Sequence, residues 1–212
     1  MTVRRSRRLP LEALAPYLLN PPAEAGVLSW PTIFGNDHLV EIEVGFGKGL
    51  FLLESSQSRP AVNFLGIEIM RKYQLFAATR LAKRGLGNVR LMCADARRML
   101  AEAVPPASVQ AVHVYFPDPW WKTRHRKRRL FTPEFAGACT RVLAPGARLF
   151  LISDVETYFG IMQDTVRQHT PLVAEDWPDA APGEPDGRTN FERKYRREGR
   201  AIYRALYRKE AG

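Results

Sequence analysis

The sequence has few cysteines and no long apolar run. Its two cysteines, Cys93 and Cys139, stand in no paired or metal-spaced motif, so we expect no metal site and a reducing, cytoplasmic compartment. No apolar run approaches the length that crosses a bilayer. The basic segment Arg4–Arg8 lacks the apolar stretch of a signal peptide. These absences argue against a disulfide-stapled, zinc- or haem-binding, or membrane-spanning protein.

Acidic residues are also scarce relative to basic ones. The 212 residues include 32 Lys and Arg against 22 Asp and Glu, which gives a formal net charge of +10. The sequence pI is about 10.0. This excess favours a polyanionic partner, nucleic acid first and an anionic membrane second. With 45% apolar residues, the length suits one domain with a full core. We expect a basic, largely irregular arm over residues 1–36 and the domain over residues 37–212.

Strand and helix patterns alternate along this domain. Apolar periodicity predicts strands over residues 39–44, 63–69, 88–93, 109–116, 148–152 and 201–207. It predicts helices over residues 50–58, 70–84, 97–103, 133–143 and 157–169. Residues 175–190 are rich in Pro, Asp and Gly and predict a long loop. The alternation predicts an α/β fold of Rossmann-like type, with helices on both faces of a mostly parallel sheet and an antiparallel C-terminal strand.

The stretch that follows the fourth predicted strand combines several functional side chains. Two prolines flank Asp118 and hold it at the C-terminal end of that strand, where ligands bind in open α/β sheets. Trp120 and Trp121 offer flat surfaces, and the basic run 124–129 offers phosphate contacts. This combination indicates chemistry on a nucleobase within a polynucleotide. A structural turn, a core tryptophan pair and a solvated basic face form the alternative interpretation.

Five acidic residues fall at or just past the ends of successive strands: Glu43, Glu68, Asp95, Asp118 and Asp154. Because the carboxyl ends of parallel strands share one edge of the sheet, these carboxylates should gather there. A loop containing Gly45, Gly47 and Gly49 follows the first of these strands and lets backbone approach a ligand closely. Leu50 occupies the sixth position, so the dinucleotide pattern Gly-x-Gly-x-x-Gly is not matched.

The chemistry of the acids distinguishes between two cofactors. A carboxylate at Glu43 would repel a pyrophosphate but attract the ammonium group of a methionine moiety. Glu68 suits a ribose diol, and Asp95 is placed to accept from an adenine amino group. The set therefore fits S-adenosylmethionine better than NAD.

Several motifs together resemble those of the bacterial tRNA (guanine-N7-)-methyltransferase family. They are Glu43–Gly49, Gly66–Glu68, Ala94–Ala96, Phe116–Lys122, Arg124–Arg129, Ser153–Asp154 and Thr189–Glu192. The similarity runs in consistent order from about Leu39 to the C-terminus, and the Phe-Pro-Asp-Pro-Trp block with its basic run is its most specific part. Trp121 fills a variable slot, and Asn190 stands where Lys is frequent. The resemblance implies a class I methyltransferase fold, S-adenosylmethionine as donor and N7 of guanosine 46 in the tRNA variable loop as acceptor.

The resemblance also implies roles for individual residues. Donor-binding positions are Glu43, Glu68, Asp95 and Asp118, with the glycines at Gly45, Gly47 and Gly49. Asp118 is also the implied catalytic position. Substrate-binding positions are Lys122, Asp154, Thr189, Asn190, Phe191 and Glu192. The tRNA-contacting run is Arg124, His125, Arg126, Lys127, Arg128 and Arg129. We expect tRNA as partner, no metal and no membrane, and either a monomer or a homodimer.

The proposed chemistry leaves two roles open for Asp118. Guanine N7 carries an in-plane lone pair and no proton, so the transfer needs no general base. Asp118 either stabilises the positive charge that develops on the base or accepts from the guanine N1–H and amino edge. Competing hypotheses are an NAD-dependent dehydrogenase, a non-catalytic RNA-binding protein, and a methyltransferase acting on a small molecule or on protein. The glycine pattern opposes the dehydrogenase, and the full set of strand-end acids opposes a non-catalytic protein. The basic runs oppose a small-molecule or protein substrate.

Overall fold

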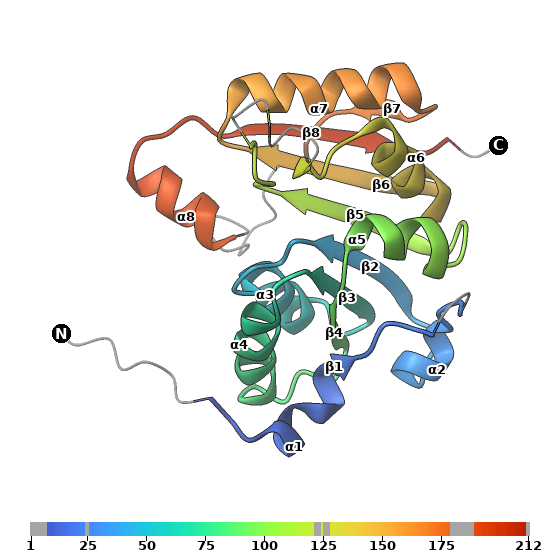
Figure 1. Cartoon of the computed structure of the whole chain (residues 1–212), viewed down its shortest axis with the longest axis vertical. Coiled ribbons are helices and arrows are strands. Elements are labelled where there is room, and N and C mark those ends of the chain that lie inside the picture. The colour runs from blue at the N-terminus through green and yellow to red at the C-terminus, as the bar shows by residue number, and fades with distance from the viewer. Residues whose placement is uncertain (1–7, 24–25, 121–123, 125–127, 179–188, 211–212) are drawn as a thin grey trace.

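The computed structural model describes residues 8–23, 26–120, 124, 128–178 and 189–210. The strands are β1 (Leu18–Leu19), β2 (Leu39–Val44), β3 (Val62–Glu68), β4 (Val89–Cys93), β5 (Val109–Tyr115), β6 (Leu143–Ser153), β7 (Val173–Glu175) and β8 (Tyr203–Arg208). They form one eight-stranded sheet in the order β1-β4-β3-β2-β5-β6-β8-β7 (Figure 1). Strand β8 alone runs opposite to the other strands, so its pairs with β6 and β7 are antiparallel. The predicted mostly parallel sheet with an antiparallel C-terminal strand is therefore confirmed.

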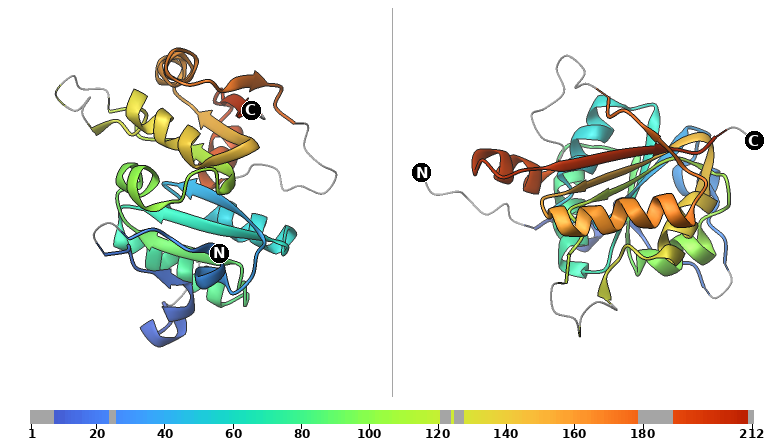
Figure 2. Two further views of the ribbon diagram at one scale, coloured as in Figure 1. Left: turned by 90° about the vertical axis from the view of Figure 1, so that its right-hand side faces the viewer. Right: turned by 90° about the horizontal axis from the view of Figure 1, so that it is seen from above.

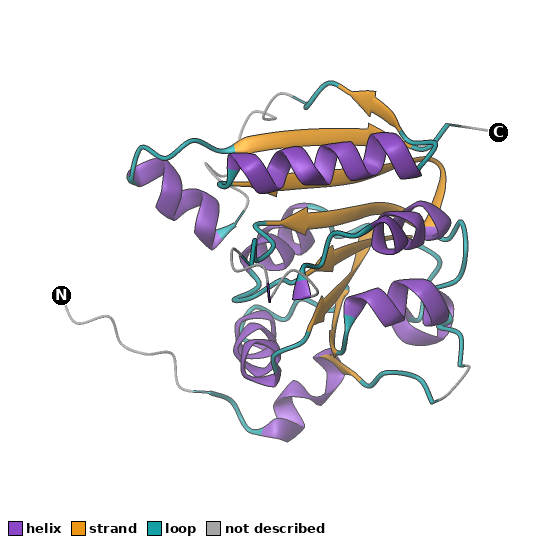
Figure 3. Ribbon diagram, turned by 45° about the horizontal axis from the view of Figure 1, so that its top comes forward, coloured by secondary structure: helices purple, strands orange, loops and turns teal. Residues whose placement is uncertain are grey.

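Helices cover both faces of this sheet. They are α1 (Leu11–Leu14), η1 (Ala15–Tyr17), α2 (Trp30–Phe34), α3 (Leu50–Ser58), α4 (Arg71–Ala82), α5 (Ala96–Arg98), η2 (Met99–Ala103), α6 (Pro133–Val142), α7 (Glu156–His169) and α8 (Asn190–Arg197). One apolar core lies between the sheet and α2, η2, α6 and α7, and a second lies between the sheet and α1, α3 and α4. Figure 2 shows α7 and α3 on opposite sides of the strands, and Figure 3 shows the same layering by element type. No described helix is long and apolar enough to cross a membrane.

Local sequence signals explain the elements whose limits match the prediction. The bounds of β2 and α3 agree with the expected ranges 39–44 and 50–58. Helix α6 begins after Thr132, whose hydroxyl accepts a hydrogen bond from the Phe135 backbone N–H, with Pro133 in the first turn. Strand β6 begins earlier than expected, at Leu143, and the register of its pairing with β5 shifts there.

The prediction of little regular structure over residues 1–36 is wrong for part of that segment. Residues 11–34 contain α1, η1, β1 and α2. Strand β1 pairs with β4 through Leu18 and Leu91, and the Leu14 side chain is fully buried. Pairing with a distant strand and burial of an apolar side chain stabilise these short elements, so local propensity alone does not reveal them.

Two elements near the C-terminus were also not predicted. The short strand β7 lies at the edge of the sheet beside β8, at the start of the predicted loop. Helix α8 occupies what the sequence presents only as a basic tail. Thr189 caps it by accepting a hydrogen bond from the backbone N–H of Glu192. The pattern Thr-x-x-Glu is a helix-start signal that could have located this helix.

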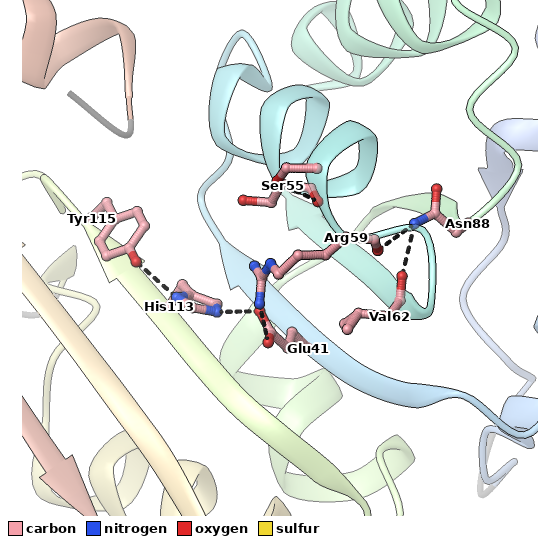
Figure 4. A network of polar contacts seen from close by, with 8 residues as sticks. Glu41, Ser55, Arg59, Val62, Asn88, His113 and Tyr115 are labelled. Atoms are coloured by element: carbon pink, nitrogen blue, oxygen red, sulfur yellow. Dashed lines mark hydrogen bonds and ion pairs between the residues drawn. The ribbon is translucent and has the colours of Figure 1, made fainter. Parts of the chain in front are cut away.

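A buried polar network joins the two central strands below the ligand-binding edge (Figure 4). The Glu41 carboxylate on β2 accepts from the Arg59 guanidinium and lies 2.9 Å from His113 Nε2 on β5. His113 Nδ1 is 2.7 Å from the Tyr115 hydroxyl. Asn88 fixes the Arg59 turn by donating to the carbonyls of Arg59 and Val62. The network holds β2 against β5. Strand β2 carries Glu43, and β5 leads into the loop of residues 116–120, called here the Asp118 loop.

Glu41→Gln should destabilise the protein in a pH-dependent way. Burial raises the Glu41 pKa, but the hydrogen bond and charge of His113, followed by Arg59, outweigh it and lower that pKa from 4.5 to about 2. A lowered pKa stabilises the fold above pH 4.5, and this contribution disappears as the pH falls toward about 2. We expect the variant to lose about 1–3 kcal/mol of unfolding free energy at about pH 7 and progressively less toward about pH 3. Urea unfolding curves of both proteins at several pH values measure this loss. A difference in unfolding free energy that does not change with pH would contradict a stabilising role of the Glu41 carboxylate.

Candidate active site

The glycine loop between β2 and α3 brings backbone close to the sheet edge. Gly47 donates its N–H to Glu68 Oε2 at 3.1 Å. Gly49 precedes α3 with a φ of 66°, and a Cβ there would lie 2.7 Å from the Cβ of Ala77. Both the left-handed backbone and the contact with α4 therefore require glycine at this position. The predicted strand, glycine loop and helix are present, with the loop seated between Glu68 and α4.

Glu43 is a buried carboxyl group with an unsatisfied oxygen. Its side chain lies near the end of β2 and is 3% exposed. Within the described residues, its Oε2 atom is buried without a hydrogen-bond partner. Burial first, and the nearby Glu68 charge second, raise the Glu43 pKa from 4.5 to about 8, while the Leu52 backbone opposes the shift. Burying such a group costs free energy, so its place at a ligand-binding edge suits a cationic ligand that restores the charge.

Glu68 is held in a fixed orientation at the end of β3. Its two carboxylate oxygens accept from the backbone N–H groups of Gly47 and Met70, at 3.1 and 3.0 Å. The residue is 8% exposed. A carboxylate oxygen accepts more than one hydrogen bond, so this geometry leaves acceptor capacity for ligand hydroxyl groups.

Asp95 follows β4 and caps the short helix α5. Its Oδ1 accepts from the Arg97 backbone N–H at 2.9 Å, and its Oδ2 pairs with the Arg97 guanidinium at 2.7 Å. These interactions with Arg97 lower the Asp95 pKa. The neighbouring Ala94 donates its N–H to the Glu68 carbonyl at 3.1 Å, so Asp95 lies at the same sheet edge as Glu68.

The Asp118 loop is conformationally strained on both sides of the acid. Phe116 and Trp120 have φ values of 51° and 42°, a region that non-glycine residues rarely adopt. The loop is braced because Arg129 donates from Nε to the Pro119 carbonyl at 2.9 Å. Asp118 itself is exposed at the end of β5. Strained backbone that surrounding contacts maintain is common at functional sites, and here it presents one carboxylate to solvent at the ligand-binding edge.

Helix α8 lies against this loop and is anchored by ion pairs. The Phe116 ring packs on Tyr195 and Phe191, with ring centroids 5.5 and 6.0 Å apart. Arg193 pairs with Glu54 of α3 through two contacts of 2.7 and 2.8 Å. Figure 1 shows α8 at the end of the sheet toward which β5 points. The predicted residues 189–192 are thus brought next to the Asp118 loop, far from it in sequence.

Within this segment the side chains differ in exposure. Phe191 is 50% exposed, whereas Thr189 and Glu192 are buried. Glu192 accepts from Arg204 and Arg196 at 2.5 and 3.2 Å, which ties α8 to β8. Glu192 therefore has a structural role that the motif alone did not reveal.

Comparison with known proteins places the chain in a family. Residues 37–205 match the family model described as "Putative methyltransferase". A protein of Rhodopirellula baltica named tRNA (guanine-N(7)-)-methyltransferase is 39% identical over 203 residues, covering 92% of this chain and 75% of that protein. A protein of the same name from Alkalilimnicola ehrlichii is 37% identical, with 98% and 91% coverage. The chain belongs to the tRNA (guanine-N(7)-)-methyltransferase family. The resemblance drawn from the motifs is confirmed.

Solved structures with the same fold are more distant in sequence. The 16S rRNA methyltransferase KamB has a TM-score of 0.61 at 15% identity, with 86% of this chain and 93% of that chain covered. The aminoglycoside resistance methyltransferase NpmB1 has a TM-score of 0.59 at 18% identity, with 82% and 89% covered. These similarities identify the class I methyltransferase fold that the family membership implies.

The remaining predicted site residues of this family member divide into two groups. Lys122, His125, Arg126 and Lys127 lie outside the described residues. Arg124 and Arg128 are exposed, and the Arg128 guanidinium lies 5.2 Å from the centre of the Trp120 ring. Asp154 is paired with Arg200 at 2.5 Å. Within the described ranges, no group of three or more His, Cys, Asp and Glu residues could hold a metal ion.

Proposed function

We propose that this chain transfers a methyl group from S-adenosylmethionine to N7 of guanosine 46 in the tRNA variable loop. Membership of the tRNA (guanine-N(7)-)-methyltransferase family over nearly the whole chain carries the proposal. The buried, unsatisfied carboxyl group of Glu43 gives it independent physical support, because it suits a ligand with a positive amino-acid end. The net charge of +10 supports an RNA substrate.

Three acids at the sheet edge would hold the donor. Glu43 would pair with the ammonium group, Glu68 would accept from the ribose hydroxyl groups, and Asp95 would accept from the adenine amino group. The open space beside Gly45 and Gly47 leaves room for the ligand, whereas Gly49 packs against α4. The donor supplies an electrophilic methyl group on a positively charged sulfonium.

The chain's role toward guanine is mainly to position it. N7 needs no deprotonation, so alignment of the base supplies much of the rate. We place Asp118 beside the base, where its charge is stabilising as the ring becomes cationic. Further contacts would come from Lys122, Asp154 and the segment Thr189–Glu192, of which Phe191 is the exposed aromatic. The run Arg124–Arg129 would contact the tRNA backbone.

Nucleoside analysis tests this proposal directly. Bulk tRNA incubated with the protein and a labelled methyl donor should yield labelled 7-methylguanosine. A tRNA transcript containing guanosine 46 should be methylated, and the matched transcript with adenosine there should not. Label in another nucleoside would refute the N7 assignment, whereas equal labelling of both transcripts would refute the position. Thermal shift by NADH but not by S-adenosylmethionine would support the dehydrogenase alternative.

Glu68→Ala should weaken donor binding without weakening tRNA binding. The substitution removes the acceptor for the ribose hydroxyl groups and releases the Gly47 and Met70 amides. We expect donor affinity to fall by about 1–3 kcal/mol, the range for a lost hydrogen bond to a charged group. Isothermal titration with S-adenosylmethionine measures it. Glu102→Ala, an exposed acid on η2 paired with Arg98, is the control and should bind the donor as the wild type does.

A further inference from the structure

Helix α4 carries a basic stripe along its outer face. The stripe consists of Arg71, Lys72, Phe76, Arg80 and Arg84. Four-residue spacing places Lys72, Phe76 and Arg80 above one another on one side of the helix, and Arg84 follows in the turn just after it, where it donates to the Arg80 carbonyl. Phe76 is 40% exposed and lies between the charged residues Lys72 and Arg80 on this side of the helix. The opposite side of α4 is buried through Leu75, Ala77, Ala78 and Leu81.

The cations of this stripe have no acidic partner in the part of the chain that the structure describes. The sequence contains no Asp or Glu between Glu68 and Asp95. Among the described residues, no ion pair joins Arg71, Lys72, Arg80 or Arg84 to a carboxylate. Arg71 donates to the Gln74 side chain, and Arg80 and Arg84 donate to the carbonyls of Lys48 and Arg80. These neutral partners leave the positive charges available to an anion.

Helix α8 provides an instructive contrast. Its sequence is as basic as that of α4, and the same reasoning would assign it to phosphate binding. In the structure, however, Arg193 pairs with Glu54, Arg196 with Glu192, and Lys194 with Glu198. Arg200, just beyond the helix, pairs with Asp154. Arg193 and Arg200 therefore tie α8 and its flank to other elements, while Arg196 and Lys194 are neutralised by acids of the helix and its C-cap.

The stripe adjoins the active site. Helix α4 starts at Arg71, three residues after Glu68, and Arg80 donates to the Lys48 carbonyl of the glycine loop at 2.8 Å. Burial lowers the Arg80 pKa, as do the charges of Arg84 and Arg193, although Glu54 opposes them. Bound phosphate would relieve this crowding of like charges. A macromolecule whose base enters the site must also cover the surface around it.

We propose that the α4 stripe is a tRNA-binding surface, in which Lys72, Arg80 and Arg84 contact the phosphate backbone and Phe76 stacks on an exposed base or ribose. This surface does not include the basic run 124–129, and the proposal rests on the proposed tRNA substrate. The positive charge of the stripe complements the phosphates of tRNA. An exposed aromatic side chain among cations is typical of surfaces that bind single-stranded or looped RNA.

A double variant, Lys72→Gln with Arg84→Gln, tests the ionic part. Both side chains are exposed and glutamine is a good helix former, so the fold should persist. The control is a second double variant, Arg167→Gln with Arg98→Gln. It also removes two positive charges, but these lie on α7 and α5 and are paired with Asp164 and Glu102. Binding of unmodified tRNA is measured over a range of salt concentrations for both proteins. The α4 variant should bind several-fold more weakly, and its log–log salt slope should fall by about 1.4–1.8, since each lost phosphate contact removes about 0.7–0.9.

Other measurements separate this surface from the function on which it rests. The α4 variant should bind S-adenosylmethionine normally and methylate saturating tRNA at the wild-type single-turnover rate. Phe76→Ala should weaken tRNA binding without changing the salt slope, because stacking releases no counterions. Equal salt slopes for the α4 variant and the wild type would overturn the surface alone, provided that the wild type still forms 7-methylguanosine. Failure of the wild type to bind tRNA would overturn both.

Discussion

Asp118→Asn is expected to slow methyl transfer strongly while leaving both ligands bound. In a single-turnover assay with saturating tRNA and donor, the barrier should rise by about 2–4 kcal/mol, the range for losing one preorganised electrostatic group. The reason is that the carboxylate charge matters most as the guanine ring becomes cationic. The substitution keeps the size of the side chain, so the loop strained at Phe116 and Trp120 should retain its shape.

Affinities and thermal stability distinguish the possible roles of Asp118. If it acts mainly by accepting from the guanine N1–H edge, tRNA affinity should drop and the saturated rate should survive. If it is only a turn residue, the melting temperature should fall. Asp164→Asn, an exposed acid on α7, is the matched control and should change none of these quantities. A saturated Asp118→Asn rate within about twofold of the wild type, well under 1 kcal/mol, would mean that the residue is not catalytic.

Glu43→Gln is expected to make the protein more stable and worse at binding its donor. The raised pKa of Glu43, about 8, means that the folded protein retains a proton that the unfolded chain loses above pH 4.5. Stability therefore falls as the pH rises from about 4.5 to about 8. Because glutamine stays neutral, the variant should gain about 2–4 kcal/mol of unfolding free energy at pH 8 and almost none near pH 4.5.

Donor binding should change in the opposite direction. Loss of the carboxylate should weaken S-adenosylmethionine binding by about 1–3 kcal/mol, as for a lost hydrogen bond to a charged group. The wild type should also release a proton from Glu43 when it binds the donor near pH 7, which titration in buffers of different ionisation enthalpy detects. The variant should lack this component. Unchanged donor affinity would remove Glu43 from the site.

Glu41→Gln is the matched control for this experiment. It makes the same chemical change two residues earlier on β2, but Glu41 is satisfied by His113 and Arg59. That variant should lose stability at neutral pH and keep its donor affinity. Opposite pH dependences for two neighbouring glutamates would separate a carboxylate that serves the fold from one that serves a ligand.

Local patterns were sufficient for the centre of the fold. The alternation of apolar residues and the following glycines locate β2, the loop and α3, since these signals act over a few residues. The acids at Glu43, Glu68 and Asp95 follow from the same reading, because parallel strands end at a common edge. Local patterns did not locate β1 and β7, because strands of two and three residues exist only through pairing with β4 and β8.

The sequence by itself determined the fold class, the family and the acids of the candidate site, because each depends on motifs contiguous in the chain. Only the tertiary structure decided which basic side chains are already paired with acids and which remain available to bind an anion. The cations of α4 and α8 look alike in sequence, yet Glu54 and Asp154 reach α8 and its flank from other elements, and Glu192 pairs with Arg196 within the helix. Likewise, Glu41 and Glu43 are the same residue type on one strand. The fold places His113 and Arg59 beside Glu41, whereas the Oε2 atom of Glu43 is buried without a hydrogen-bond partner among the described residues. The strength of a charge depends on its neighbours in space, and these come from distant parts of the chain.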